Sequence, residues 1–219
     1  VGCPQPKASV FINSWNSPSY DNACVHGFID GNDGTVYQTL PWNHRGWHCG
    51  SGSKGSGNNT HIGVEMCEPA CIRYTSGSNF TCSDLSTAKA VAKRTYDAAV
   101  ELFAMLCKQY NLNPTADGVI VSHREGYSRG IASNHGDPEH LWNGLGMGYT
   151  MDGFRKAVQA AMGGSPAGGG SSSGSGGSGI SGFPAVPFTV KVLIPDLNYR
   201  SAPSMSGSVK GQTGKGIFT

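Results

Sequence analysis

The stretch ACVHGFIDGNDGTVYQTL, residues 23–40, decides the fold class because it places a turn between two strand-like runs. ACVHGFID and TVYQTL carry the apolar and β-branched residues that favour strands. GNDG, residues 31–34, supplies the glycines and the Asn and Asp side chains that tight turns require. We therefore predict a β-hairpin formed by residues 23–30 and 35–40.

Two short apolar runs predict further strands. HIGVEM, residues 61–66, has the length of a strand and carries one carboxylate among apolar neighbours. GVIVSH, residues 118–123, is predicted to be a buried strand that ends in His123. Such a strand would place the imidazole at the rim of a sheet, where functional sites are commonly built.

Two segments predict helices. Apolar residues recur at helical spacing in residues 85–112, and Ser83 or Ser86 is the expected N-cap. Residues 151–162 predict a shorter closing helix. Because strands are separated by helices along the chain, the fold class is α/β, with a mixed central β-sheet flanked by helices.

A change of composition divides the chain. In residues 163–182 all but three positions are Gly or Ser, and such a segment is typical of a flexible linker. We therefore expect one domain in residues 1–162 and a second, β-rich part in residues 183–219. The second part is too short to fold alone without a staple.

Charge and hydropathy exclude two function classes. The net charge is only +2, which gives a nucleic-acid partner little electrostatic support. No run of 18 apolar residues exists, so we expect no membrane insertion. We expect a monomer.

Seven cysteines leave the redox setting open. Cys67, Cys71 and Cys82 cluster in sequence and could host one disulfide in an oxidising compartment, whereas reduced thiols are the simpler interpretation. Cys107 falls on the apolar face of the long helix and is predicted to be a buried thiol. No CxxC pair is present, which argues against a structural zinc knuckle.

The stretch SHREGYSRGIASNHGDPEHLW, residues 122–142, concentrates three histidines without hydrophobic periodicity, so we expect a loop. A loop of this length can place either His135 or Asp137 beside His123, and it also carries His140. Catalytic zinc takes three ligands of the His, Cys or carboxylate type and leaves a position for water, and this loop offers two at most besides His140. Spacing alone does not separate this interpretation from surface histidines.

Two other elements offer polar groups to a pocket. Glu65, in HIGVEM, should point away from Val64 and Met66, toward a pocket where a carboxylate can act as a general base. The alternative is an edge strand with Glu65 in solvent. The segment 42–63 is rich in aromatic residues, which suit either a saccharide or peptide groove or packing on the core.

These motifs in this order resemble the zinc-dependent N-acetylmuramoyl-L-alanine amidases related to peptidoglycan recognition proteins, especially phage and clostridial endolysins. The order is a DG hairpin followed by VYQ, then GWHCG, NTHIGVEM, a long helix, VIVSHREG and a DP step. The resemblance covers residues 1–162. It implies a Zn²⁺ cofactor, bacterial peptidoglycan as partner, and hydrolysis of the amide between muramic acid and L-alanine.

The resemblance also assigns roles. His123 matches the family's second zinc histidine, and Asp137, which precedes Pro138, matches another zinc ligand. His135 stands where many members have a lysine that stabilises the oxyanion, and a ligand role for it stays open. Glu65 matches the acid that activates water.

The pocket wall follows from the same resemblance. Trp47 and His48 match a pocket-wall motif that would bind substrate, and His26 lies on a strand where many relatives also carry histidine. The family's first zinc histidine would fall just before Val1. We therefore expect a core strand and one ligand upstream, with weak zinc binding by the chain from Val1 onward. Cys3 is near, but we do not expect it to bind zinc.

The tail LNYRSAPSMSGSVKGQTGKG resembles the first half of a bacterial SH3-like cell-wall-binding domain. Together the two resemblances imply a peptidoglycan hydrolase that acts at the cell wall, either secreted or held in the cytoplasm until phage lysis. The alternative is a non-catalytic peptidoglycan receptor with the same fold. A cysteine hydrolase is disfavoured because no cysteine precedes a helix in a strained turn.

Overall fold

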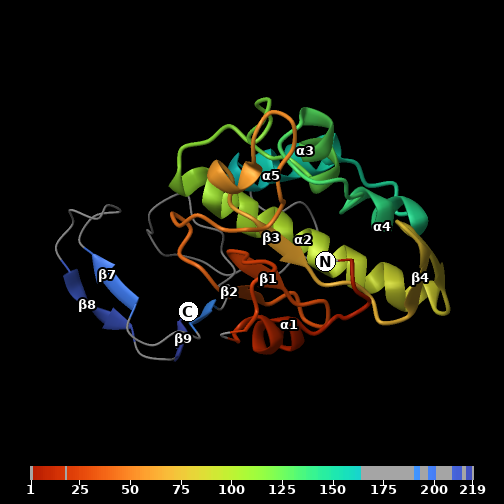
Figure 1. Cartoon of the computed structure of the whole chain (residues 1–219), viewed down its shortest axis with the longest axis horizontal. Helices are drawn as coiled ribbons and strands as arrows, with labels where there is room; N and C mark the ends of the chain where they lie inside the picture. Colours follow the sequence, from red (N-terminus) through yellow and green to blue (C-terminus); the bar gives the residue numbers. More distant parts are fainter. Residues whose placement is uncertain are drawn as a thin grey trace, which may run out of the picture.

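The computed structural model describes residues 2–17 and 19–163 in full, and the backbone of four short strands between residues 190 and 218. A mixed sheet with the order β2-β1-β3 lies at the centre (Figure 1). β1 (Gly27–Ile29) pairs antiparallel with β2 (Val36–Gln38) and parallel with β3 (Val64–Met66). The predicted hairpin, the third strand and the α/β class are confirmed.

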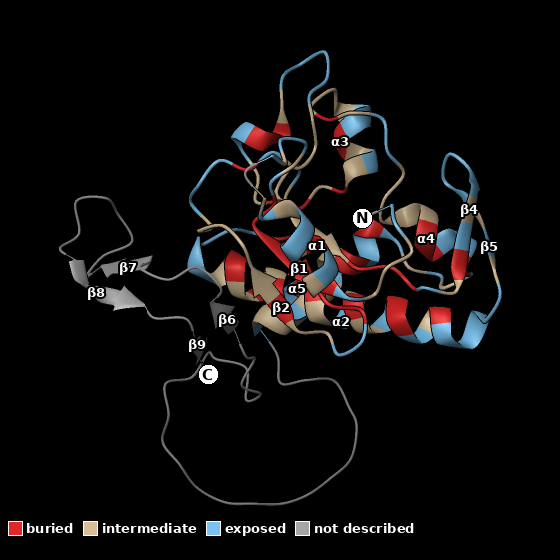
Figure 2. Cartoon of the chain, turned by 60° about the horizontal axis from the view of Figure 1, so that its bottom comes forward, coloured by how far each residue is buried: buried red, intermediate tan, exposed pale blue. Residues whose placement is uncertain are grey.

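Alternation along β1 explains why helices cover both faces of this sheet. Phe28 packs on α1 (Ala8–Trp15), where its ring stacks on Phe11 with centroids 5.7 Å apart. Ile29, the next residue, joins the opposite core with α2 (Leu85–Gln109) and α5 (Met151–Gly163). Successive strand residues face opposite sides, so each layer receives every second side chain. Figure 2 shows β1 buried throughout.

The helix predictions hold, with shifts at the ends. α2 begins after Asp84, whose carboxylate accepts a hydrogen bond from the backbone N–H of Thr87, and not after Ser83 or Ser86. A carboxylate caps a helix as well as a hydroxyl does. α5 runs one residue past the predicted boundary, to Gly163. The hairpin of β4 (Ile72–Ser76) and β5 (Asn79–Cys82) was not predicted, nor was α1.

Two predictions about the second half of the domain are wrong. Residues 118–123 form no strand, and residues 122–142 are not one loop. His123 is instead the first residue of α3 (His123–Arg129), and α4 (Glu139–Gly144) follows. The described strands of the domain pair as β2-β1-β3 and β4-β5, so residues 118–121 have no ladder partner among them. Ser122 then caps a helix at the point where the strand was expected to end.

The remaining predictions of organisation fall mostly outside the described residues. The predicted Gly/Ser linker lies there. Of the part predicted to be SH3-like, the structure gives only the backbone of β6 (Val190–Val192) paired with β9 (Gly216–Phe218), and of β7 (Leu197–Arg200) paired with β8 (Val209–Thr213). All seven cysteines are free thiols. Among the described helices, none has the length and apolar character needed to cross a bilayer.

Candidate functional site

A capping box positions His123. The Ser122 hydroxyl accepts a hydrogen bond from the backbone N–H of Glu125 at 3.0 Å, and the Glu125 carboxylate accepts one from the N–H of Ser122 at 3.2 Å. These two bonds satisfy N–H groups that a helix start otherwise leaves without partners. They fix the first turn of α3 and therefore the direction in which His123 leaves the backbone.

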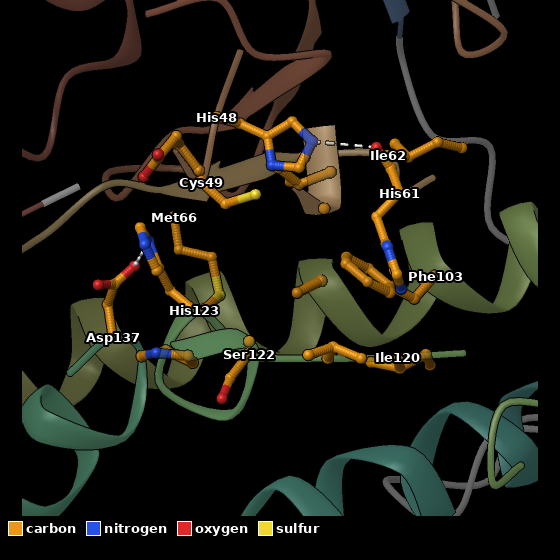
Figure 3. A pocket seen from close by; sticks show the side chains of 18 of the residues that line it. His48, Cys49, His61, Ile62, Met66, Phe103, Ile120, Ser122, His123 and Asp137 are labelled. Atoms are coloured by element: carbon orange, nitrogen blue, oxygen red, sulfur yellow. Dashed lines mark hydrogen bonds and ion pairs between the residues drawn. The ribbon is translucent and has the colours of Figure 1, made fainter. Parts of the chain in front are cut away.

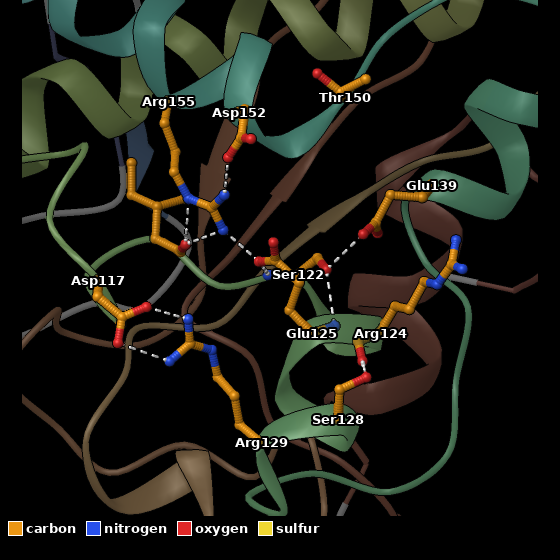
Figure 4. A network of polar contacts seen from close by, with 12 residues as sticks. Asp117, Ser122, Arg124, Glu125, Ser128, Arg129, Glu139, Thr150, Asp152 and Arg155 are labelled. Carbon is orange, nitrogen blue, oxygen red and sulfur yellow. Dashed lines mark hydrogen bonds and ion pairs between the residues drawn. The ribbon is translucent and has the colours of Figure 1, made fainter.

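Side chains from three helices hold this cap in place (Figure 4). Arg155 of α5 forms an ion pair with Glu125 and donates two hydrogen bonds of 2.9 Å to the carbonyl of Ile120. The Ser122 hydroxyl donates to Glu139 of α4 at 2.9 Å. Because the network joins α3, α4 and α5, the segment before His123 is fixed by side chains and not by a strand ladder.

Three predicted site residues come together beside α3. The ligand-type atoms of His123, His135 and Asp137 all lie within 4.8 Å of one another. Nδ1 of His123 is 3.7 Å from Oδ2 of Asp137, and the rings of His123 and His135 are tilted with centroids 4.5 Å apart. His135 is exposed, whereas the other two are partly buried.

The chemistry of this cluster fits a divalent zinc ion. Burial is the largest single influence and raises the pKa of Asp137, but the hydrogen bond and charge of His123, together with other nearby groups, hold that pKa well below its usual range. The carboxylate is therefore ionised at neutral pH. Two imidazoles and one carboxylate form a donor set that suits Zn²⁺ and leaves an open position.

A cavity of about 560 Å³ extends from this cluster toward the core. Residues 62–66 line one side, residues 119–123 line the opposite side, and α2 contributes apolar side chains such as Phe103. Figure 3 shows His123 and Asp137 together at one end and Ile120 and Phe103 toward the other. The cavity is therefore apolar along most of its length and polar where the cluster lies.

Glu65 and His48 line the same cavity. Val64 and Met66, on either side of Glu65, pack against the core shared with α2, as the predicted alternation requires. His48 forms a hydrogen bond of 3.0 Å between Nε2 and the carbonyl of His61, and burial lowers its pKa to about 4. The His48 imidazole is therefore neutral at physiological pH.

The other two predicted substrate residues lie apart from the cavity lining. Trp47 is 55% exposed and its backbone pairs with Cys24. His26 is fully buried, its Nδ1 accepts a hydrogen bond from the N–H of Gly63, and its Nε2 donates to the carbonyl of His44. With both nitrogens engaged by the backbone, His26 has the contacts of a core residue.

Sequence reasoning missed polar groups that border the site. Tyr74 bonds to both carboxylate oxygens of buried Glu68, at 2.9 and 3.0 Å, and to Nε2 of His140 at 2.6 Å. Glu68 and His140 also line the cavity. No sequence pattern connects these three residues. The spacing of Ser122 and Glu125, in contrast, is a capping-box signal that would have predicted α3.

Comparison with known proteins agrees with this architecture. Residues 5–140 match the model of the N-acetylmuramoyl-L-alanine amidase family Amidase_2. The match covers more than half of the chain and includes His123, His135 and Asp137. The chain belongs to this family.

Among individual relatives, the amidase CwlH of Bacillus subtilis (strain 168) is 50% identical over 38 residues, which are 17% of this chain and 15% of CwlH. XlyA of the same organism is 55% identical over 38 residues, 17% of this chain and 12% of XlyA. CwlA of a Bacillus species is 28% identical over 82 residues, 37% of this chain and 31% of CwlA. The chain thus matches less than a third of the length of each of these relatives.

Proposed function

We propose that the protein hydrolyses the amide bond between N-acetylmuramic acid and L-alanine in bacterial peptidoglycan, with a zinc ion held beside α3. One observation carries the proposal. His123, His135 and Asp137 converge within 4.8 Å of one another, and His123 and Asp137 line the polar end of a cavity, in a chain of the amidase family. The cavity gives room for a substrate next to the cluster.

His123 and Asp137 would hold the ion, through Nδ1 and a carboxylate oxygen. Zinc supplies Lewis acidity, which polarises a carbonyl and acidifies water. The ionised Asp137 offsets the positive charge, and the apolar wall of the cavity strengthens each electrostatic contact by excluding solvent.

Glu65 would take the proton of the attacking water and return it to the alanine nitrogen when the amide bond breaks. Its place on β3, in the cavity wall, supports this role. Trp47 and His48 would contact the glycan or stem peptide, and neutral His48 would do so without a charge. For His26 we propose only that it supports the wall, because its ring nitrogens bond to the backbone.

His135 has two candidate roles, zinc ligand or donor to the developing oxyanion, and a matched pair of variants separates them. His135→Ala removes both functions, whereas His135→Lys restores a positive donor without a good zinc ligand. If H135K recovers activity and both variants keep the wild-type zinc affinity, His135 is the oxyanion donor. If both lose zinc, His135 is a ligand.

The function is tested by the release of L-alanyl amino termini from purified peptidoglycan. The zinc-loaded longer gene product should release them, and its His123→Ala variant should not. A chelator should stop the reaction, and added zinc should restore it. Zinc-loaded protein that releases no amino termini would overturn the proposal, and loss of hexosamine linkages instead would indicate a glycosidase.

The match to an amidase family does not favour the alternative of a non-catalytic peptidoglycan receptor. The surroundings of the cysteine thiols do not favour a cysteine hydrolase. Cys49 and Cys107 line the cavity, and burial raises the pKa of both. A thiol held in its protonated form is a poor nucleophile.

We further propose that residues 163–182 tether the amidase domain of residues 1–162 to an SH3-like part, residues 183–219, that binds the cell wall. A tether of this kind raises the local substrate concentration. The protein would then act at the wall. The expected upstream strand and ligand are tested by comparing the zinc stoichiometry of this chain with that of a longer gene product.

A further inference from the structure

Two of the seven cysteines lie on opposite sides of one hairpin. β4 and β5 pair antiparallel, and Ile72 is the register partner of Cys82. The carbonyl of Cys71, the residue before Ile72, accepts hydrogen bonds from the N–H of Ser83 at 2.9 Å and from its hydroxyl at 3.1 Å. Cys71 and Cys82 therefore occupy diagonal positions at the open end of the hairpin. Strand spacing puts the Cα atoms of such a pair about 6 Å apart, within the range of a disulfide.

The side chains of this pair face the same core. Both pack against the cluster that contains Ile72 and Leu141, because Cys71 precedes the first residue of β4 and the alternation of that strand does not turn it away. The Cys71 thiol donates a hydrogen bond of 3.3 Å to the carbonyl of Asp84. Burial raises the pKa of this thiol, and the Cys82 thiol, which forms a side-chain hydrogen bond with it, raises it further. The two sulfur atoms are therefore close neighbours.

Cys67, the third cysteine of the same segment, has different surroundings. It is 1% exposed, packs with the core on the α1 side of the sheet, and burial raises the pKa of its thiol to about 12. Cys71 and Cys82 are partly exposed. Thiol–disulfide exchange requires a thiolate and access for the attacked disulfide. Of the three cysteines that cluster in sequence, the structure therefore favours Cys71 and Cys82 as the reactive pair.

We propose that Cys71 and Cys82 form a reversible disulfide that closes the open end of the β4–β5 hairpin when the protein meets an oxidised small-molecule disulfide. One thiolate of the pair attacks the small disulfide and releases one small thiolate, and the second thiolate of the pair then displaces the other. The S–S bond of the small molecule breaks and one between Cys71 and Cys82 forms. The two protons and two electrons of the protein thiols end on two small thiols.

The disulfide would act on a strand that borders the candidate site. Tyr74 of β4 bonds to buried Glu68 and to His140, and both of these residues line the cavity. Closing the loop of residues 71–82 removes conformational freedom mainly from the unfolded chain. We therefore expect oxidation to stabilise the domain. The inference depends neither on zinc nor on the proposed activity, so its test stands apart from theirs.

The test uses the full chain, freed of reductant, with oxidised glutathione as the probe. Trypsin cleaves after Arg73, which lies between Cys71 and Cys82. Free thiols are alkylated, and mass spectrometry of the unreduced digest should show the two flanking peptides joined. Cys67 falls in the same peptide as Cys71, so variants separate the two. Cys71→Ala and Cys82→Ala should abolish the joined peptides, and Cys67→Ala is the matched control that should keep them.

Oxidation should raise the melting temperature of wild type and C67A by about 5–10 °C, and a reductant should reverse the rise. The melting temperature of C71A and C82A should not change. Joined peptides that persist in C71A would assign the bond to another cysteine and overturn the inference, and so would a wild-type digest with all of its thiols alkylated. An unchanged melting temperature in cross-linked wild type would overturn the stabilising role.

Discussion

Two groups of histidines in the same domain have opposite surroundings. The locked histidines, His26, His48 and His61, each bond a ring nitrogen to a backbone carbonyl, at 2.8, 3.0 and 2.9 Å. The open histidines, His123 and His135, lie ring to ring beside the ionised Asp137. The difference teaches that a histidine's hydrogen-bond partners, and not its presence in a motif, decide whether its ring nitrogens are available to a metal ion.

The largest effect that this comparison predicts is on metal binding. Replacing His123 by Ala removes one of the proposed ligands, and zinc affinity should fall more than about 100-fold, beyond the range for groups that only support a ligand. The control is His61→Gln, because His61 donates Nε2–H to the carbonyl of Gly118. Its zinc affinity should stay within about twofold of wild type, in chelator competition. If H123A and H61Q lost zinc affinity to the same extent, the two groups of histidines would not differ in metal binding.

The second prediction concerns the space between Gly63 and the ring of His48, one of the locked histidines. A Cβ added at Gly63 would lie 2.1 Å from Cγ of His48, so Gly63→Ala must displace the ring or the strand. Overpacking of this kind should lower the free energy of unfolding by about 3 kcal/mol.

Gly163→Ala is the matched control, because nothing lies within 4 Å of a Cβ at Gly163. Urea denaturation compares the two variants, with the slope m used to verify that only stability has changed. The packing argument fails if G63A unfolds at the same urea concentration as G163A.

The smallest effect is a dependence on pH. Burial lowers the pKa of His48 to about 4, so the folded protein binds a proton less readily than the unfolded chain. This contribution to stability is complete above the unfolded pKa of about 6.5 and is lost as pH falls toward 4. Its slope is at most about 1.4 kcal/mol per pH unit.

His48→Gln keeps a donor for the carbonyl of His61 but does not titrate. The free energy of unfolding, measured from pH 7 to 4.5, should therefore fall less steeply in H48Q than in wild type. His26 still contributes to the slope in both proteins, because burial lowers its pKa as well. Parallel curves for the two proteins would show that His48 is not held neutral by the fold.

Local patterns predicted the elements whose signals lie within a short segment. The GNDG turn set the β1–β2 hairpin, and a long run of apolar residues at helical spacing set α2. The strand predicted for residues 118–123 is wrong because an apolar run of six residues suits a strand or a buried irregular segment equally well. Ser122 and Glu125, the polar pair that indicates the start of α3, stand at the end of this apolar run.

The site was predictable in its residue types and not in its arrangement. The sequence itself determined the sheet, the long helix and the stretch that contains His123, His135 and Asp137, because these depend on neighbours in the chain. Only the tertiary structure decided that His26 is locked by Gly63 and His44, and that Ser133 meets Cys49 across the loops. Those contacts join residues far apart in sequence, and the direction of a ring nitrogen follows from whichever partner the packing brings within hydrogen-bond distance.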